Sequence, residues 1–289
     1  MNILVTGASG QLGNELRERS NLYKTWNFYF TDTAELDIKD LSKVEEFVAA
    51  NSIETIINCA AYTAVDLAET NKDLCYAVNV TGAKNLAIVA ANKKIQLIHT
   101  STDFVFNGVH HLPYKEEDVA NPLSVYGSTK LAGENEVLAI CPNSIIVRTA
   151  WLYSAYGANF VKTMQRLGRD RDALNVIFDQ VGTPTWAGDL ANAILQIVAT
   201  KKTGSEQRGI YHYSNEGVAS WYDFAVEIMQ LSEIDCKVYP IETKEYPTPA
   251  PRPAYSVLNK AKIKSDFKLD IPHWKESLKK CILAIQNEQ

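Results

Sequence analysis

Three glycines at regular spacing stand directly behind the first apolar run of the chain. The run at 2–6 reads as a short buried strand, and the stretch VTGASGQLG places Gly7, Gly10 and Gly13 three residues apart. The next stretch, QLGNELRERS, reads as a helix. A glycine loop between a strand and a helix permits a tight turn and a close approach of backbone to a diphosphate, which faces the helix N-terminus. The pattern predicts a dinucleotide-binding unit at the start of the chain.

Short apolar runs alternate with amphipathic stretches through the first half of the sequence. We expect strands at 2–6, 27–32, 54–60, 95–101 and 143–153, and helices at 11–20, 40–51, 72–94 and 124–140. Such alternation is typical of a doubly wound, Rossmann-like parallel sheet that helices cover on both faces.

The rhythm loosens after Tyr153. We expect helices at 159–169, 188–200, 220–231 and 273–286, an apolar run at 174–178, strands at 209–214 and 237–241, and a proline-rich loop at 246–256. The fold class is therefore α/β with two domains. A dinucleotide-binding domain is predicted over 1–153, with later segments returning to it, and a smaller α+β substrate domain mainly over 154–289.

Composition excludes several classes of function. The 289-residue chain has a net charge of -5 with Lys and Arg spread along it, which argues against a nucleic-acid partner. Five separated cysteines without a C-x-x-C pair indicate reduced thiols in a cytoplasmic protein. No secretory signal and no apolar run of about 18 residues is present, so no membrane span is expected. The histidines lack metal-ligand spacing, and no metal site is predicted from them.

A carboxylate ends the second expected strand. Asp32 can accept hydrogen bonds from an adenosine ribose and would repel a 2′-phosphate, which favours NADH over NADPH. Lys39 in the neighbouring loop could offset that preference. After the third strand, the small residues of NCAAYTAVD at 58–66 would let the chain lie close to the diphosphate. Asp66 and Glu69 are interpreted as a helix N-cap region and a solvated face.

A tyrosine and a lysine share one face of the helix expected at 124–140. Tyr126 and Lys130 are four residues apart, about one helical turn. A phenol can protonate the alkoxide that a hydride transfer leaves on a ketone, and a nearby ammonium would lower the phenol's pKa from its usual value near 10. Ser101 and Thr102, at the end of the fourth strand, offer a hydroxyl that could polarise the carbonyl. The spacing predicts an acid–base pair with a hydroxyl partner.

The three motifs together, in this order, resemble an extended short-chain dehydrogenase/reductase that acts on nucleotide sugars. Finer matches narrow the resemblance to the dTDP-4-dehydrorhamnose reductase family, and they run from Met1 to the last helix: CAAYTAVDLAE, STDFVFNG, NPLSVYGSTKLAGE, RTAWLY, NFVKTM and YPTPAPRPAYSVLN. The family implies reduction of the C4 ketone of dTDP-4-dehydro-L-rhamnose by NADH or NADPH. The substrate expected as partner is therefore a dTDP-linked 4-keto sugar.

The resemblance also implies roles for individual residues. Tyr126 is the expected proton donor, Lys130 its partner and Thr102 the hydroxyl that assists. The expected cofactor-binding residues are Gly7, Gly10, Gln11, Leu12, Gly13, Asp32, Ala60, Ala61, Tyr62, Thr63, Tyr126 and Lys130. The expected substrate-binding residues are Asp103, Phe104, Trp151, Asn159 and Arg252.

Related activities remain as alternatives. Sugar-nucleotide dehydratases place Asp-Glu after the strand-end threonine, whereas Phe104 follows Asp103 here and has no group that exchanges protons. A nucleotide-sugar epimerase and a non-catalytic, reductase-like regulatory subunit stay open. Some family members join subunits through Mg²⁺ held by glutamates. Here Glu15 is expected to be a solvated helix residue and the tail offers only Glu288, so a metal-bridged dimer is not expected. The chain is predicted to be a monomer or a homodimer.

Overall fold

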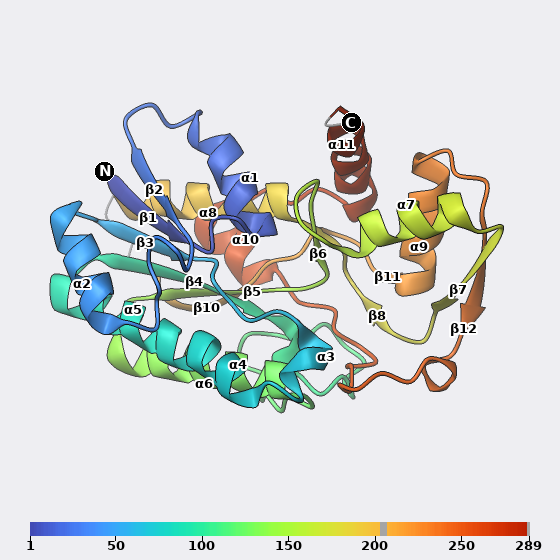
Figure 1. Ribbon diagram of the computed structural model, residues 1–289, viewed down its shortest axis with the longest axis horizontal. Coiled ribbons are helices and arrows are strands. Elements are labelled where there is room, and N and C mark those ends of the chain that lie inside the picture. The colour runs from blue at the N-terminus through green and yellow to red at the C-terminus, as the bar shows by residue number, and fades with distance from the viewer. Residues whose placement is uncertain (203–206, 288–289) are drawn as a thin grey trace.

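A six-stranded parallel sheet is the centre of the molecule (Figure 1). The computed structural model describes residues 1–202 and 207–287. The strands are β1 (Asn2–Thr6), β2 (Asn27–Thr31), β3 (Thr55–Asn58), β4 (Gln96–Thr102), β5 (Ile145–Thr149) and β10 (Gly209–His212), in the order β10-β5-β4-β3-β1-β2. Every neighbouring pair is parallel, which confirms the predicted fold class. The strand order reverses between β1 and β3, and ligands of doubly wound sheets bind at that point.

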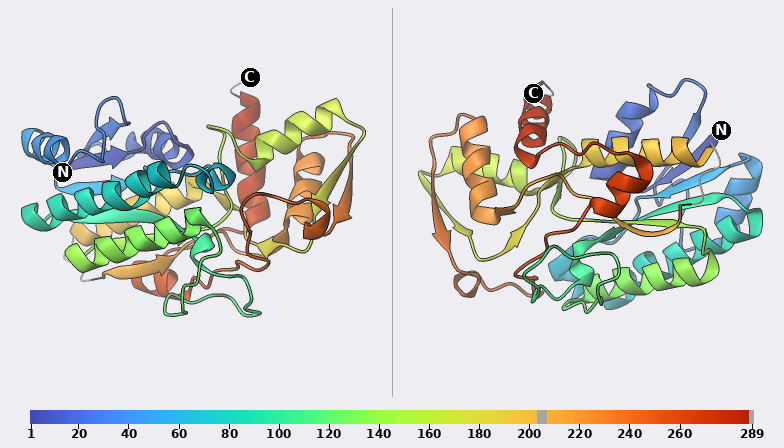
Figure 2. Two further views of the ribbon diagram at one scale, coloured as in Figure 1. Left: turned by 60° about the horizontal axis from the view of Figure 1, so that its bottom comes forward. Right: turned by 180° about the vertical axis from the view of Figure 1, so that it is seen from behind.

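Helices cover both faces of the sheet (Figure 2). One layer holds α1 (Gln11–Ser20), α8 (Ala187–Lys202) and α10 (Ala261–Phe267), and the other α2 (Leu41–Ala50), α5 (Ala83–Lys93) and α6 (Val125–Ile140). Successive strand side chains point to opposite faces, so Ile3 and Val5 pack under the first layer and Leu4 under the second. The alternation of strands and helices in the sequence therefore produces two separate apolar cores.

A long apolar helical run, Lys72–Lys93, ends with α5. It consists of α4 (Lys72–Tyr76), a π-helical turn at Ala77–Gly82 and α5. The most apolar 18-residue window of the run Lys72–Lys93 has a mean hydropathy of 1.3, and the run is long enough to cross a membrane by length and composition alone. However, 56% of its most apolar window is buried inside the molecule, because α5 packs on the sheet as a core helix does.

A smaller unit lies beyond the carboxyl ends of the strands, on the right in Figure 1. Its helices are α7 (Phe160–Asp170), α9 (Trp221–Leu231) and α11 (Trp274–Asn287), and its strand pairs are β7 (Ala173–Ile177) with β12 (Lys237–Ile241), β8 (Val181–Gly182) with β11 (Ala219–Ser220), and β6 (Leu152–Tyr153) with β9 (Thr185–Trp186). Its apolar core is separate from the two sheet cores. The short helix α3 (Val65–Ala68) follows β3.

Several segments differ from the sequence-based expectation. The strand expected at 143–153 divides into β5 and β6, because Trp151 takes a left-handed backbone conformation with φ 48°. Helix α10 was not predicted. Of the segments after residue 153, β10, α8 and α10 lie on the central sheet. The predicted boundary at residue 153 remains a prediction, together with the return of later segments.

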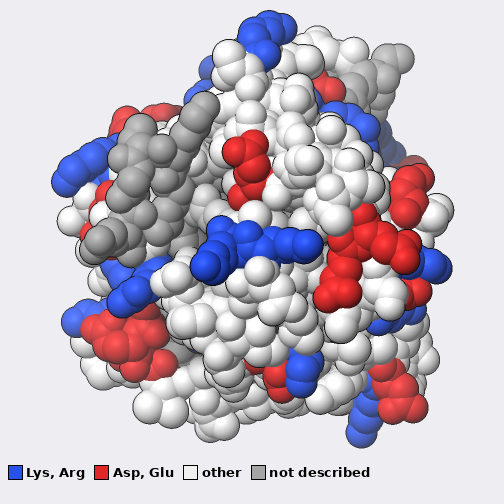
Figure 3. All heavy atoms as spheres, turned by 90° about the vertical axis from the view of Figure 1, so that its left-hand side faces the viewer, with Lys and Arg blue, Asp and Glu red and all other residues white. Residues whose placement is uncertain are grey.

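Charged side chains of both signs are interspersed on the side remote from the small unit (Figure 3). Basic and acidic groups lie beside one another on that face. The face shown presents no broad field of one sign.

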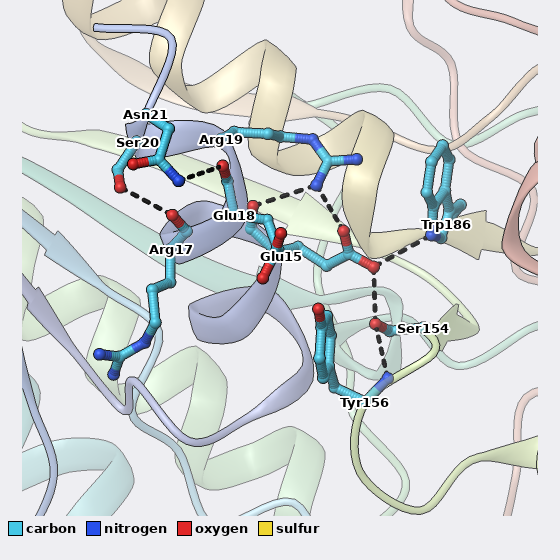
Figure 4. A network of polar contacts seen from close by, with 9 residues as sticks. All are labelled: Glu15, Arg17, Glu18, Arg19, Ser20, Asn21, Ser154, Tyr156 and Trp186. Carbon is cyan, nitrogen blue, oxygen red and sulfur yellow. Dashed lines mark hydrogen bonds and ion pairs between the residues drawn. The ribbon is translucent and has the colours of Figure 1, made fainter. Parts of the chain in front are cut away.

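Glu15 is not the solvated residue that the sequence suggested. It lies on α1 and is 4% exposed. Its Oε1 accepts hydrogen bonds from the Ser154 hydroxyl at 2.7 Å and from the Trp186 indole at 3.1 Å, and its Oε2 pairs with Arg19 (Figure 4). A buried carboxylate is tolerated only where charge and hydrogen bonds compensate its desolvation. Glu15 therefore ties the first helix of the sheet to β9 and to the loop after β6.

These contacts do not fit a metal site at Glu15. Both carboxylate oxygens already accept hydrogen bonds from donors, and the guanidinium of Arg19 would repel a divalent cation. Within residues 1–202 and 207–287, no group of three or more His, Cys, Asp or Glu side chains is arranged to hold a metal ion. Glu288 lies outside the described residues.

Replacing Glu15 tests the structural importance of this network. Glu15→Ala leaves the Ser154 hydroxyl and the Trp186 indole buried without their acceptor. The free energy of unfolding should fall by about 2–4 kcal/mol in urea denaturation. Glu18→Ala on the exposed side of the same helix is the control and should change it by less than about 0.5 kcal/mol. Equal effects of the two substitutions would show that the network adds no stability.

Candidate active site

The glycine loop packs directly on the segment that follows β3. Gly7 has a positive φ of 68°, and a Cβ on it would lie 2.6 Å from the backbone nitrogen of Ala60. A Cβ on Gly13 would lie 2.5 Å from the carbonyl oxygen of Gly7. Only glycine fits at either position. Helix α1 begins after Gly10 without a side-chain cap, so its first N–H groups stay available for an anion.

A cavity of about 880 Å³ opens over this loop, and we call it the glycine-loop cavity. It extends from the end of β2 to the ends of β4 and β5. All the residues predicted to bind the cofactor line it: Gly7, Gly10, Gln11, Leu12, Gly13, Asp32, Ala60, Ala61, Tyr62, Thr63, Tyr126 and Lys130. The fold thus brings these separated segments to one space of a size that suits a dinucleotide.

Asp32 lies at the end of β2 and holds the glycine loop. Its Oδ2 accepts hydrogen bonds from the backbone nitrogen of Ser9, at 2.7 Å, and from the Ser9 hydroxyl. Lys39 also lines the cavity, and its ammonium lies 3.4 Å from Asp37. Asp32 therefore combines a structural contact with a position on the cavity wall, and the basic residue in the neighbouring loop is engaged by another carboxylate.

Tyr126 meets the end of β4 through a close backbone contact. A Cβ on Gly127 would lie 2.2 Å from the carbonyl oxygen of Phe104, so glycine is required next to the tyrosine. Ser124 caps α6 by accepting from the Gly127 nitrogen at 3.1 Å. The rings of Tyr126 and Phe104 pack edge to face at 5.6 Å. The N-terminus of α6 is thereby fixed against the strand end that carries Thr102.

Burial controls the ionisation of the predicted catalytic pair. Desolvation raises the pKa of Tyr126 to about 12, although a hydrogen bond with Thr102 opposes the rise. Burial lowers the pKa of Lys130 to about 8, and its Nζ donates to the carbonyl oxygen of Thr100 at 2.7 Å. Lys130 is not among the groups that shift the pKa of Tyr126 here, so its expected influence on the phenol remains a prediction. At neutral pH the phenol is protonated, which is the form that can donate a proton.

Asp103 is the most deeply buried acid of this site. It is 2% exposed and lines the glycine-loop cavity. Its Oδ1 accepts from the Thr102 hydroxyl at 3.1 Å, while its Oδ2 has no hydrogen-bond partner among the described residues. Burial raises the pKa of Asp103 to about 6, against the opposing effect of Ser256 and Thr102. A buried oxygen without a partner is an acceptor available to a ligand hydroxyl.

A second cavity of about 1020 Å³, the cap cavity, lies between the sheet edge and the small unit. It shares Phe104, Trp151 and Trp221 with the glycine-loop cavity. The indole rings of Trp151 and Trp221 stack with centroids 3.6 Å apart. The two cavities therefore meet at the end of β4, next to Tyr126 and the Trp pair.

Arg252 and Asn159 are both engaged within the protein. The Arg252 guanidinium lines the cap cavity and binds Asp66 through two hydrogen bonds of 2.9 and 2.8 Å. Asn159 lines the glycine-loop cavity, caps α7 by accepting from the Lys162 nitrogen, and donates to the Ser154 carbonyl. The structure thus places Arg252 beside the cap cavity but Asn159 in a loop-stabilising role.

The expectation for Asp66 and Glu69 was wrong in detail. Asp66 binds Arg252 far along the chain, and this hydrogen bond lowers the pKa of Asp66. The Glu69 carboxylate accepts from the backbone nitrogen of Val125 at 2.9 Å and so caps the helix that carries Tyr126. Both side chains face other elements because α3 lies between α6 and the proline-rich loop, an arrangement that local sequence does not reveal.

Sequence reasoning also missed residues of the cap cavity. Trp221, Tyr239 and Tyr246 supply aromatic surface to its wall. Trp221 is the first residue of α9, and Ser220 before it caps this helix in a capping box. The capping motif predicts where the helix begins, but nothing in the local sequence indicates that Trp221 reaches the cavity. Asn79, in the π-helical turn, accepts from the Tyr62 nitrogen at 2.8 Å and so fixes the segment that borders the glycine-loop cavity.

Comparisons with known proteins agree with this geometry. Residues 1–287 match the family described as RmlD substrate binding domain. A dTDP-4-dehydrorhamnose reductase of Aggregatibacter actinomycetemcomitans is 41% identical, over 96% of this chain and 97% of that one. A crystal structure of a dTDP-4-dehydrorhamnose reductase from Clostridium acetobutylicum superposes with a TM-score of 0.94 at 46% identity, covering 99% of this chain and 100% of that one.

A further solved structure contains a bound dinucleotide. It is the dTDP-4-dehydrorhamnose reductase of Bacillus anthracis in complex with NADP, with a TM-score of 0.93 and 38% identity, covering 98% of this chain and 99% of that one. The family model and the near full-length relatives leave no part of the described sheet or small unit unmatched. This chain belongs to the dTDP-4-dehydrorhamnose reductase family.

Proposed function

We propose that the chain reduces the C4 ketone of dTDP-4-dehydro-L-rhamnose to the alcohol of dTDP-L-rhamnose, with NAD(P)H as hydride donor. The observation that carries the proposal is the position of Tyr126 and Thr102 on the wall of the glycine-loop cavity, where it meets the cap cavity. A hydride donor on one side and a ketone on the other would meet at these hydroxyls. The relatives named above support the choice of sugar nucleotide.

The chain's own groups supply the proton chemistry. Bound NAD(P)H would deliver the hydride to C4 of the sugar. The Tyr126 phenol, which is protonated at neutral pH, donates its proton to the oxygen that becomes negative. The Thr102 hydroxyl orients that oxygen, and the cationic Lys130 favours the phenolate left behind.

The remaining substrate would occupy the cap cavity. Asp103, on the wall of the glycine-loop cavity, accepts from a sugar hydroxyl through its free Oδ2, and Trp151, which lines both cavities, provides an apolar surface for the ring. Phe104 lines both cavities and packs against Tyr126. Arg252 meets the diphosphate, since a guanidinium matches phosphate oxygens in charge and geometry.

NADH is the cofactor that we propose as preferred. Asp32 borders the glycine-loop cavity at the end of β2, where a carboxylate binds the ribose hydroxyls and repels a 2′-phosphate. Lys39, the nearest basic residue in sequence, pairs with Asp37. We also infer a cytoplasmic location, because all five cysteines are free thiols and NAD(P)H is a reductant of that compartment.

Tyr126→Phe removes the proposed proton donor while keeping the ring. NADH oxidation at 340 nm with dTDP-4-dehydro-L-rhamnose should fall by about 10²–10⁴-fold, the usual contribution of a positioned general acid. The Kd for NADH should stay within about twofold, because the phenol does not hold the diphosphate. Tyr76→Phe, at an exposed tyrosine on α4, is the matched control and should keep full activity.

The same assay separates the competing activities. Normal turnover by Tyr126→Phe would refute the assignment of the proton donor. Inversion of the sugar without net loss of NADH in the wild-type protein would indicate an epimerase. Binding of NADH without any turnover would indicate a regulatory subunit.

Asp32→Ala tests the cofactor preference. Loss of the carboxylate removes both the ribose acceptor and the repulsion of a 2′-phosphate, so the ratio of kcat/KM for NADPH to that for NADH should rise by about tenfold or more. The ratio is the informative quantity, because Asp32 also holds Ser9 and its loss affects both cofactors. Asp40→Ala, at the N-cap of α2, should leave the ratio unchanged. An unchanged ratio in Asp32→Ala would remove Asp32 as the selecting residue.

A further inference from the structure

An ion pair joins the rim of the sheet to the proline-rich loop across the cap cavity. Asp66, on α3, and Arg252, in the loop between β12 and α10, both line that cavity. The Asp66 Oδ1 accepts from Arg252 Nη1 at 2.9 Å and its Oδ2 accepts from Nη2 at 2.8 Å. The two residues are 186 positions apart, so the pair exists only in the folded chain.

Asp66 also holds the backbone of the loop. Its Oδ1 accepts from the Ala250 nitrogen at 3.1 Å, and Arg252 Nη1 donates to the Ala250 carbonyl at 2.7 Å. The later part of the loop is fixed differently, by backbone hydrogen bonds between Val181 and the residues Ala254 and Ser256. Among the described residues, the long-range hydrogen bonds of the segment 247–253 all go to Asp66.

The guanidinium keeps one two-donor edge for a ligand. Its end edge, Nη1 with Nη2, binds the carboxylate, and the second Nη1 hydrogen points to Ala250. The Nε–H and the other Nη2–H have no hydrogen-bond partner among the described residues. Two parallel N–H groups are the arrangement that binds two oxygens of one phosphate.

The solvent exposure of the Asp66–Arg252 ion pair indicates that it contributes little to stability. The side chains of Asp66 and Arg252 are 39% and 23% exposed. Ion pairs this open to solvent add little to stability, because water screens them and ordering two side chains opposes them. Fixing the direction of the guanidinium is a larger effect, since a long side chain loses rotamer freedom on binding unless it is already ordered.

We propose that Asp66 is a positioning residue for substrate binding: it orients Arg252 so that the free Nε–Nη2 edge receives the diphosphate of the sugar nucleotide. The inference rests on the proposed function, which assigns the diphosphate to Arg252. Asp66 acts through Arg252 and anchors Ala250, so the arginine and the loop that carries it are held in the same orientation.

Asp66→Asn separates positioning from catalysis. The amide keeps the size of the side chain and its acceptor for Ala250 but loses the charge and one acceptor for Arg252. The KM for dTDP-4-dehydro-L-rhamnose should rise about tenfold, while kcat and the Kd for NADH stay within about twofold. Glu136→Gln removes an exposed ion pair with Lys84 outside both cavities and should change none of these quantities.

Binding of fragments without turnover identifies the group that is recognised. By calorimetry, Asp66→Asn should weaken dTDP about tenfold but leave the affinity for thymidine, which has no phosphate, unchanged. Equal losses for both ligands would mean that Asp66 shapes the cavity in general, and tighter binding of dTDP would mean that Asp66 competes with the diphosphate. Either outcome overturns the inference.

The double variant distinguishes this inference from the proposed function. If Asp66 acts through Arg252, Asp66→Asn/Arg252→Ala should bind dTDP no more weakly than Arg252→Ala alone. Additive losses would show that Asp66 acts independently of the arginine. An Arg252→Ala variant that binds dTDP normally would refute the diphosphate assignment itself.

Discussion

The contact between Gly127 and the Phe104 carbonyl is the constraint on which the site depends. Backbone approaches backbone there without room for a side chain, so the first turn of α6 lies against the end of β4. That approach brings a helix-borne phenol next to a strand-borne hydroxyl. A similar contact, between Gly7 and Ala60, brings the glycine loop against the segment after β3. The two glycine contacts together position both sides of the glycine-loop cavity.

Burial also shifts the pKa values of the assembled groups. Desolvation raises the pKa of the half-buried Tyr126 to about 12, so its phenol is a weaker acid than that of a free tyrosine, and it carries its proton at neutral pH as a free tyrosine does. This state suits reduction, in which the strongly basic oxygen of the former ketone must gain a proton. The packing of α6 against the end of β4 therefore both assembles the site and removes water from the phenol of Tyr126.

The sequence predicted what local pattern and strand order determine. Glycines at 7, 10 and 13 follow a strand, and Tyr126 and Lys130 share a helix face, so fold class and the cavity-lining residues could be inferred before any coordinates. Helix α10 was not predicted, because a helix of seven residues is too short to show a periodic pattern of apolar residues. The break in the strand expected at 143–153 was also not predicted, because nothing in the sequence indicates that Trp151 takes a left-handed backbone conformation.

Partners distant in sequence explain the two misread carboxylates. Glu15 was expected to be a solvated helix residue, and Asp66 together with Glu69 was interpreted as a helix N-cap region and a solvated face. Glu15 accepts hydrogen bonds from Ser154 and Trp186, which are more than a hundred residues away in the sequence. Asp66 forms an ion pair with the similarly distant Arg252. Their burial differs accordingly: Glu15 is enclosed and stabilises the junction between the two units, whereas Asp66 stays partly exposed at the cavity.

Because they differ in exposure, the contacts of Glu15 and of Asp66 have different effects. Removing a carboxylate from a dry environment strands its hydrogen-bond donors, so the Glu15 network contributes mainly to stability. At a wet site the stranded groups return to water, and little stability is lost. The main effect of Asp66 is therefore to fix the orientation of the Arg252 guanidinium. This orientation affects the binding of an anionic ligand rather than the stability of the fold.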